Sequence, residues 1–230
     1  MTTLDLFEPE RRSDLSQWFT PAWIARRLAL WLPVEPDGFV LEPSAGSGEL
    51  VEGLVRAGWP LDRIVAVEVD TAWCTHLRRR FPGLQVIEAD FLKLAKAWQG
   101  PKPRHVLLNP PYEDGADVAF IEASLRLVGP LGSVCALVKT DIEYSSGRMP
   151  LWRDVARVER RARLLERPAF GKHVDGEKVT GAERNYIGLE MRLRSAPRVP
   201  GEVELVAEEA WSRTDHESTW SRRGVLGGVP

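Results

Sequence analysis

Residues 40–50 read Val-Leu-Glu-Pro-Ser-Ala-Gly-Ser-Gly-Glu-Leu, and this stretch is the most informative part of the sequence for the fold. The apolar start predicts a short strand that ends in an acid and is followed by a turn of small residues. Apolar positions then recur at helical spacing as far as residue 55, which predicts an amphipathic helix. Gly46 and Gly48 let the backbone adopt positive φ and pass close to a ligand. The stretch therefore predicts a strand, a turn and a helix in an α/β sheet.

Two phosphate-binding motifs do not fit this turn. The Gly-Lys-Ser/Thr of a P-loop does not follow it, and the acidic Glu42 would repel a phosphate. Counted from Gly46 and Gly48, the third glycine position of the dinucleotide fingerprint holds Val51. The turn alone is a weak indication of a nucleoside site, so the following strands have to support it.

The next two strands also end in acids. The run Arg63-Ile64-Val65-Ala66-Val67-Glu68 ends about twenty residues after the glycine turn, where nucleoside-binding sheets place a carboxylate for ribose hydroxyls. A third strand at residues 84–87 ends near Asp90 and Phe91, which can flank an adenine ring by hydrogen bonding and stacking. Each acid taken alone also fits a solvated strand end. Their order at successive strand ends favours a nucleoside ligand.

A fourth apolar run, residues 105–108, is followed directly by Asn109-Pro110-Pro111-Tyr112. Ligands of open α/β sheets bind outside the carboxyl ends of the strands. The Asn109 amide offers an acceptor and two N–H donors, and the prolines leave their carbonyls free to accept. Tyr112 supplies a flat face, so the tetrapeptide suits a planar group with an exocyclic amine, such as a flipped base. The alternative is a Pro-Pro turn with Tyr112 as an aromatic residue on its rim.

Together these residues resemble the class I S-adenosylmethionine-dependent methyltransferases, specifically the amino-group enzymes that methylate adenine N6 in DNA. The resemblance covers about residues 14–193 and includes a Thr-Pro segment at residues 20–21. It implies a Rossmann-like α/β fold with a mainly parallel seven-stranded sheet and a reversed C-terminal hairpin. It also implies S-adenosyl-L-methionine as cofactor, S-adenosyl-L-homocysteine as product and double-stranded DNA as partner.

The resemblance implies roles for single residues as well. The reaction site would be formed by Asn109, Pro110, Pro111 and Tyr112. Cofactor contacts are expected from the Thr-Pro segment, the glycine turn, the second and third strand ends and the reaction site: Phe19, Thr20, Pro21, Glu42, Pro43, Ser44, Ala45, Gly46, Gly48, Glu68, Val69, Asp90, Phe91 and Asn109. The implied mechanism is direct methyl transfer without a metal. A covalent cytosine-C5 mechanism would need a Pro-Cys nucleophile, and neither cysteine follows a proline.

Three other functions stay open. RNA base amino-methyltransferases use the same amine chemistry. Protein glutamine N5-methyltransferases share the Asn-Pro-Pro-Tyr motif, but roughly forty residues before the glycine turn leave little room for their helical substrate domain. A catalytically silent methyltransferase fold could also serve as a binding subunit.

The net charge of −2 hides an uneven distribution. Residues 148–172 hold eight basic and three acidic side chains, whereas residues 202–217 hold six acids and one arginine. A basic segment in a nearly neutral protein can contact phosphates. We expect nucleic-acid contacts from six basic residues in and just after this segment: Arg148, Arg153, Arg157, Lys172, Lys178 and Arg184. The alternative is a solvated helix face, because residues 153, 157, 160 and 161 also fall at helical spacing.

The chain is expected to form one catalytic domain over residues 1–195, with an N-terminal helix capped by Thr20 and a partly mobile extension over residues 196–230. Further helices are expected near residues 49–57, 72–80 and 117–127, a strand at 133–139, and a hairpin from 163–165 and 185–193.

Without a separate recognition domain, target choice would come from loops 113–117, 140–152 and 171–184 or from a partner. Composition and the absence of a signal or membrane segment predict a cytoplasmic protein, monomeric or homodimeric, without a metal.

Overall fold

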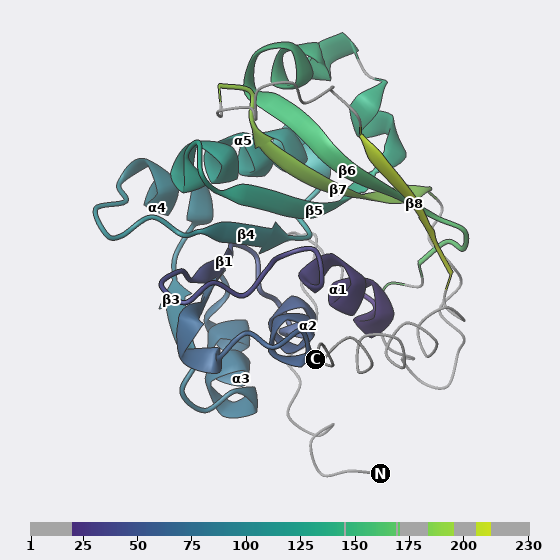
Figure 1. Cartoon of the computed structure of the whole chain (residues 1–230). Coiled ribbons are helices and arrows are strands. Elements are labelled where there is room, and N and C mark those ends of the chain that lie inside the picture. Colours follow the sequence, from purple (N-terminus) through teal and green to yellow (C-terminus); the bar gives the residue numbers. More distant parts are fainter. Residues whose placement is uncertain (1–19, 145, 169, 171–183, 196–205, 213–230) are drawn as a thin grey trace, which may run out of the picture.

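The structure is a computed structural model that describes residues 20–144, 146–168, 170, 184–195 and 206–212. At its centre lies an eight-stranded sheet with the strand order β3-β2-β1-β4-β5-β7-β6-β8 (Figure 1). Its strands are β1 (Val40–Glu42), β2 (Ile64–Glu68), β3 (Gln85–Glu88), β4 (His105–Leu108), β5 (Ser133–Lys139), β6 (Ala156–Leu164), β7 (Tyr186–Leu193) and β8 (Ala207–Trp211). Strands β1 to β5 pair in parallel, and β7 runs antiparallel to both β5 and β6. The predicted Rossmann-like sheet with its reversed hairpin is confirmed, with one strand more than predicted.

Helices cover both faces of the sheet. They are α1 (Ala22–Ala29), α2 (Glu49–Arg56), α3 (Thr71–Arg80), α4 (Phe91–Lys96) and α5 (Ala116–Val128). One apolar core joins α1, α2 and α3 to the sheet, and a second core joins α4 and α5 to its other face (Figure 1). Burial on both faces explains why the central strands β2, β4 and β5 are almost continuously apolar.

Helix α1 packs closely on α2, the helix that follows the glycine turn. A Cβ atom at Gly53 would lie 2.8 Å from the backbone of Ala25, so only glycine allows this approach. The N-cap of α1 is Pro21 and not Thr20 as predicted, and no side chain caps the helix. Instead the Pro21 carbonyl accepts from Ile24 N at 2.9 Å, while Thr20 is buried.

The basic segment forms a strand, so its interpretation as a helix face is wrong. Arg148 ends a 3-10 turn, Ser146–Arg148, a π-helical turn follows at Leu151–Val155, and β6 then pairs with β7 and β8. Strand β8 lies within the segment predicted to be a partly mobile extension and joins β6 in parallel. Among the described residues, no helix has the length and apolar character needed to cross a membrane.

Candidate active site

The glycine turn leads from the end of β1 into α2, and the next strand holds it in place. Ala45 N donates to the Val67 carbonyl at 3.0 Å, and Gly46 N donates to Glu68 Oε2 at 2.8 Å. Gly46 and Gly48 have φ values of 48° and 88°, which side chains rarely tolerate. These contacts fix the path of the turn along the carboxyl ends of β1 and β2.

Glu42 ends β1 as a fully buried acid. Its Oε1 accepts from Ser44 N at 3.1 Å, and Ser44 Oγ lies 3.4 Å from the same oxygen. Within the described part of the chain, its Oε2 is buried and has no hydrogen-bond partner. Burial raises the pKa of Glu42 well above its ordinary value, although the hydrogen bond from Ser44 N opposes the shift. Oε2 is therefore a buried acceptor that a ligand donor could satisfy.

Glu68 ends β2 and accepts hydrogen bonds from three backbone N–H groups. Its Oε1 accepts from Val69 N at 2.8 Å and from Asp70 N at 2.9 Å, while Oε2 binds Gly46. Burial raises the pKa of Glu68, and the hydrogen bonds from Asp70, Gly46 and Val69 counteract that rise. The next side chain, Val69, is 53% exposed. An acid beside an exposed apolar side chain can bind a ribose next to a planar base.

The third strand end differs from the expected adenine contact. Asp90 caps α4, and its Oδ1 accepts from Leu92 N at 2.9 Å and Lys93 N at 3.2 Å. Phe91 is buried in the core, with its ring centroid 5.2 Å from that of Phe120. In this arrangement the Phe91 ring is not open to stacking, and Asp90 is the more accessible of the two.

The Asn-Pro-Pro-Tyr segment begins where β4 ends and contacts the glycine turn. Ser44 Oγ donates to the Asn109 carbonyl at 3.1 Å, which joins the two motifs. The Tyr112 hydroxyl donates to Asn109 Oδ1 and also lies 3.2 Å from the Leu137 carbonyl. Tyr112 is buried and not on the rim of the turn, because its ring packs edge-on against Tyr186 at 5.6 Å. Its hydroxyl can thus orient the Asn109 amide.

Sequence reasoning missed Lys139, the last residue of β5. Its ammonium lies 4.5 Å from the centroid of the Tyr112 ring, where it makes a cation–π contact. Tyr186 pairs with Lys139 across the sheet and packs on Phe170 with centroids 4.7 Å apart. No ion pair joins Lys139 to a carboxylate among the residues with a described position. Its place at the carboxyl end of a parallel strand was the signal that could have identified it.

Three of the six basic residues expected to contact nucleic acid form ion pairs with acids. Arg148 pairs with the buried Asp117 at 3.1 Å, and Arg153 pairs with Asp154 at 2.7 Å. The buried Arg157 pairs with Glu159 at 2.5 Å, which leaves its guanidinium poorly accessible to a phosphate.

The remaining three basic residues divide between the exposed surface and the part that is not described. Arg184 is exposed near the start of β7, whereas Lys172 and Lys178 lie outside the described residues. The expected phosphate contacts therefore have less support at positions 148, 153 and 157 than at Arg184.

Comparison with known proteins gave relatives and structural neighbours, although no family model matches the chain. A ribosomal RNA small subunit methyltransferase A from Chlorobium limicola is 30% identical over 191 residues, which cover 77% of this chain and 71% of the relative. A modification methylase from Paramecium bursaria Chlorella virus NC1A is 30% identical over 108 residues, or 45% of this chain and 27% of the relative. The chain spans about a quarter to a third of the length of the first curated relatives it matches.

Among solved structures, a protein from Listeria monocytogenes described as a class I S-adenosylmethionine-dependent methyltransferase shares the fold. Its TM-score is 0.64 at 16% identity, and the match covers 91% of this chain and 71% of that one. At this identity the likeness concerns the fold alone.

Proposed function

This chain belongs to the class I S-adenosylmethionine-dependent methyltransferases, and we propose that it transfers the cofactor's methyl group to the N6 amine of adenine in DNA. The observation that carries the proposal is the join between the two motifs. Ser44 Oγ of the glycine turn donates to the Asn109 carbonyl, so the segment suited to an amine lies beside the turn suited to a cofactor. The choice of adenine in DNA as the substrate rests on two points. Asn109-Pro110-Pro111-Tyr112 resembles the reaction-site motif of DNA adenine-N6 methyltransferases, and the chain is similar to a modification methylase.

The residues of the turn fit the cofactor. Among the described residues Glu42 Oε2 has no hydrogen-bond partner, so it is a buried acceptor for an ammonium group. Glu68 already accepts from three backbone N–H groups and has one lone pair left, on Oε2, for a ribose hydroxyl. Val69 offers an exposed apolar surface for the adenine ring, with Asp90 as a polar neighbour. Bound S-adenosylmethionine supplies a methyl group that its sulfonium has already activated. The protein then has to align the acceptor amine, and alignment alone can supply much of the acceleration.

Asn109 would hold the acceptor amine through two hydrogen bonds. Its Oδ1 accepts from the Tyr112 hydroxyl, and an amide oxygen has two lone pairs, so it could also accept an amine proton. The Pro110 carbonyl, a backbone acceptor with two lone pairs, can accept the other proton. Accepting both protons turns the nitrogen lone pair toward the methyl group. The Tyr112 ring could stack on the base only after Lys139 leaves its face.

An adenine in RNA is the second candidate substrate. The relative that covers 77% of this chain is named a ribosomal RNA methyltransferase, whereas the viral modification methylase covers 45%. The amine chemistry proposed for Asn109 is the same in both nucleic acids. Among the basic side chains that the structure describes, we propose that Arg184 and Lys139 contact phosphates. A partner protein that supplies target specificity also remains part of the proposal.

The test is methylation with labelled S-adenosylmethionine. Duplex DNA, single-stranded DNA, ribosomal RNA and a release-factor protein are incubated separately, digested, and analysed for the methylated residue. We expect N6-methyladenine from DNA, and loss of most transfer in Asn109→Ala with cofactor affinity within a few-fold of wild type. Label found only in RNA would change the substrate, and label in glutamine would identify a protein methyltransferase. Cofactor binding without any transfer would favour a silent binding subunit.

A further inference from the structure

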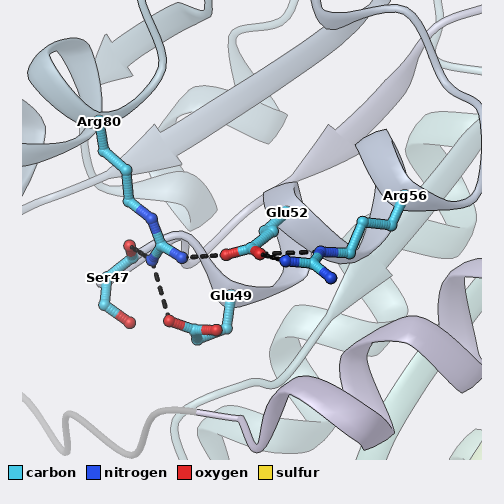
Figure 2. Close-up of polar contacts among 5 residues, drawn as sticks. All are labelled: Ser47, Glu49, Glu52, Arg56 and Arg80. Atoms are coloured by element: carbon cyan, nitrogen blue, oxygen red, sulfur yellow. Dashed lines mark hydrogen bonds and ion pairs between the residues drawn. The ribbon is translucent and has the colours of Figure 1, made fainter. Parts of the chain in front are cut away.

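Arg80, the last residue of α3, reaches back to the glycine turn. Its Nη1 donates to the Ser47 carbonyl at 2.6 Å and to Glu49 Oε1 at 2.9 Å, while its Nη2 donates to Glu52 Oε2. Figure 2 shows this guanidinium between the turn and the start of α2, with Arg56 approaching Glu52 from the other side. Arg80 therefore contacts the turn and the helix at the same time.

These contacts differ from an ordinary surface ion pair. The Arg80 side chain is 22% exposed, whereas that of Arg56 is 61% exposed and bonds only Glu52 within this cluster. Burial raises the pKa of Glu52, but the hydrogen bond from Arg56 and the charge of Arg80 hold it below its ordinary value. Exposed pairs contribute little to stability, while a charged donor on a backbone carbonyl fixes the direction of a peptide group.

The turn is held through two adjacent residues. Gly46 N–H donates to Glu68, which lies just before α3, and the Ser47 carbonyl accepts from Arg80, which ends α3. The next residue in the chain, Phe81, limits the turn as well, because a Cβ atom at Gly48 would lie 2.5 Å from its ring. Helix α3 and its flanking residues thus shape the turn without any ligand.

We propose that Arg80 is a positioning residue that keeps the Gly46–Gly48 turn in the shape required for the cofactor. This rests on the proposed function, which assigns the turn to cofactor binding. A turn that already has its bound shape does not lose further conformational freedom on binding, so its affinity is higher. Loss of Arg80 should therefore weaken cofactor binding more than loss of an equivalent ion pair elsewhere on Glu52.

Arg56 provides the matched control, since it also bonds Glu52 but does not contact the turn (Figure 2). Binding of S-adenosyl-L-homocysteine is measured by calorimetry for wild type, Arg80→Gln, Arg80→Lys and Arg56→Gln, with thermal unfolding of each ligand-free protein. We expect Arg80→Gln to weaken binding about tenfold, the loss of one charge-assisted hydrogen bond. Arg56→Gln should stay within about twofold, and Arg80→Lys should fall between them.

Amide hydrogen exchange over residues 44–50 supplies a second readout. Arg80→Gln should accelerate exchange in the turn, whereas Arg56→Gln should leave it unchanged. Wild-type affinity and wild-type exchange in Arg80→Gln would overturn the proposal, even if its thermal stability fell. If that variant fails to fold, wild-type affinity of Arg80→Lys with unchanged exchange overturns it. If wild type does not bind S-adenosyl-L-homocysteine, the proposed function fails, and the exchange comparison still decides the role of Arg80 in shaping the turn.

Discussion

At the scale of single residues, we expect the buried carboxyl group of Glu42 to couple cofactor binding to the release of a proton, if the proposed function holds. Burial raises its pKa well above the ordinary value in the ligand-free protein. A cofactor ammonium on Oε2 would stabilise the carboxylate and lower that pKa again, so a proton must leave on binding. The affinity for the cofactor should therefore rise with pH until Glu42 is already ionised in the ligand-free protein. Below that pH, part of the binding free energy goes into removing the proton.

Calorimetry in buffers of different ionisation enthalpy measures this proton. We expect wild type to release a proton on binding S-adenosylmethionine, and Glu42→Gln to release none while binding more weakly. A glutamine variant that released as many protons as wild type would assign the ionisation to another group, such as Glu68, whose pKa is also raised.

Tyr112 is the second test at this scale, because its hydroxyl and its ring have separable roles. Tyr112→Phe removes the hydroxyl that donates to Asn109 Oδ1 but keeps the packing against Tyr186. The freed Asn109 amide should align the amine less well, so we expect turnover to fall about tenfold, the loss of one hydrogen bond. Cofactor affinity should not change. Wild-type turnover of Tyr112→Phe together with slow turnover of Tyr112→Ala would leave the ring alone as the functional part.

At the scale of elements, the two charged segments of the sequence become neighbouring strands. Arg160 and Arg161 of β6 pair with Glu209 and Glu208 of β8, at 3.7 Å and 2.5 Å. Part of the basic segment is thus neutralised within the sheet by the acidic segment. The sequence analysis expected the basic segment to contact phosphates, but it could not show that acids of β8 pair with some of these arginines.

Strand β8 also connects the sheet to α1. Trp211 is buried, its indole N–H donates to Glu209 Oε2 at 2.8 Å, and its ring lies 4.7 Å from Trp31, just after α1. We expect a chain ended after Ser195 to lose about 3–5 kcal/mol in free energy of unfolding, the cost of removing a buried tryptophan.

A chain ended after Ser212 is the control, because it keeps β8 and removes only residues beyond those described. Its denaturant midpoint should equal that of the full chain. Equal midpoints for the two shortened chains would show that β8 does not stabilise the domain, and the boundary expected at residue 195 would then stand.

The strands that the sequence predicted well are those buried on both faces. Residues 105–108 and 133–139 form β4 and β5 with the expected bounds, because a continuous apolar run needs no distant partner to be recognised. Strand β6 was predicted only at residues 163–165, since its arginines fit the spacing of a helix or a strand until β7 and β8 lie beside it. Strand β8 depends on the same remote pairing and was not predicted.

The candidate site shows the same limit. Glu68 reaches the glycine turn and Asn109 reaches Ser44, because parallel strands align their carboxyl ends. The burial of Phe91 and Tyr112 depends on Phe120 and on aromatic residues further along the chain, which no local spacing reveals. Lys139 was missed for the same reason. The sequence can predict which residues follow the ends of parallel strands, whereas it cannot predict the packing around those strand ends.

At the scale of the whole molecule, the carboxyl edge of the sheet carries the candidate site, and the opposite edge holds a buried histidine. His105 begins β4 and is 3% exposed, with Nδ1 2.8 Å from Ser133 Oγ. Burial and the charges of Arg104 and Arg192 lower its pKa from 6.5 to about 4, and the opposing charge of Glu35 is too weak to prevent this. The folded protein therefore keeps His105 neutral where the unfolded chain binds a proton.

The sign of the resulting pH dependence follows from this difference. Between pH 6.5 and 4 the unfolded state binds the extra proton, so the free energy of unfolding is highest above pH 6.5 and falls as the pH is lowered. A pKa difference of this size corresponds to about 3 kcal/mol. Denaturant unfolding at several pH values checks it, with His105→Gln as the comparison. The variant should lose most of the slope between pH 6.5 and 4 but keep the steeper fall at lower pH, where the carboxylates titrate. An unchanged slope in His105→Gln would assign this acid sensitivity to those carboxylates, because the amide that replaces the imidazole cannot bind the proton.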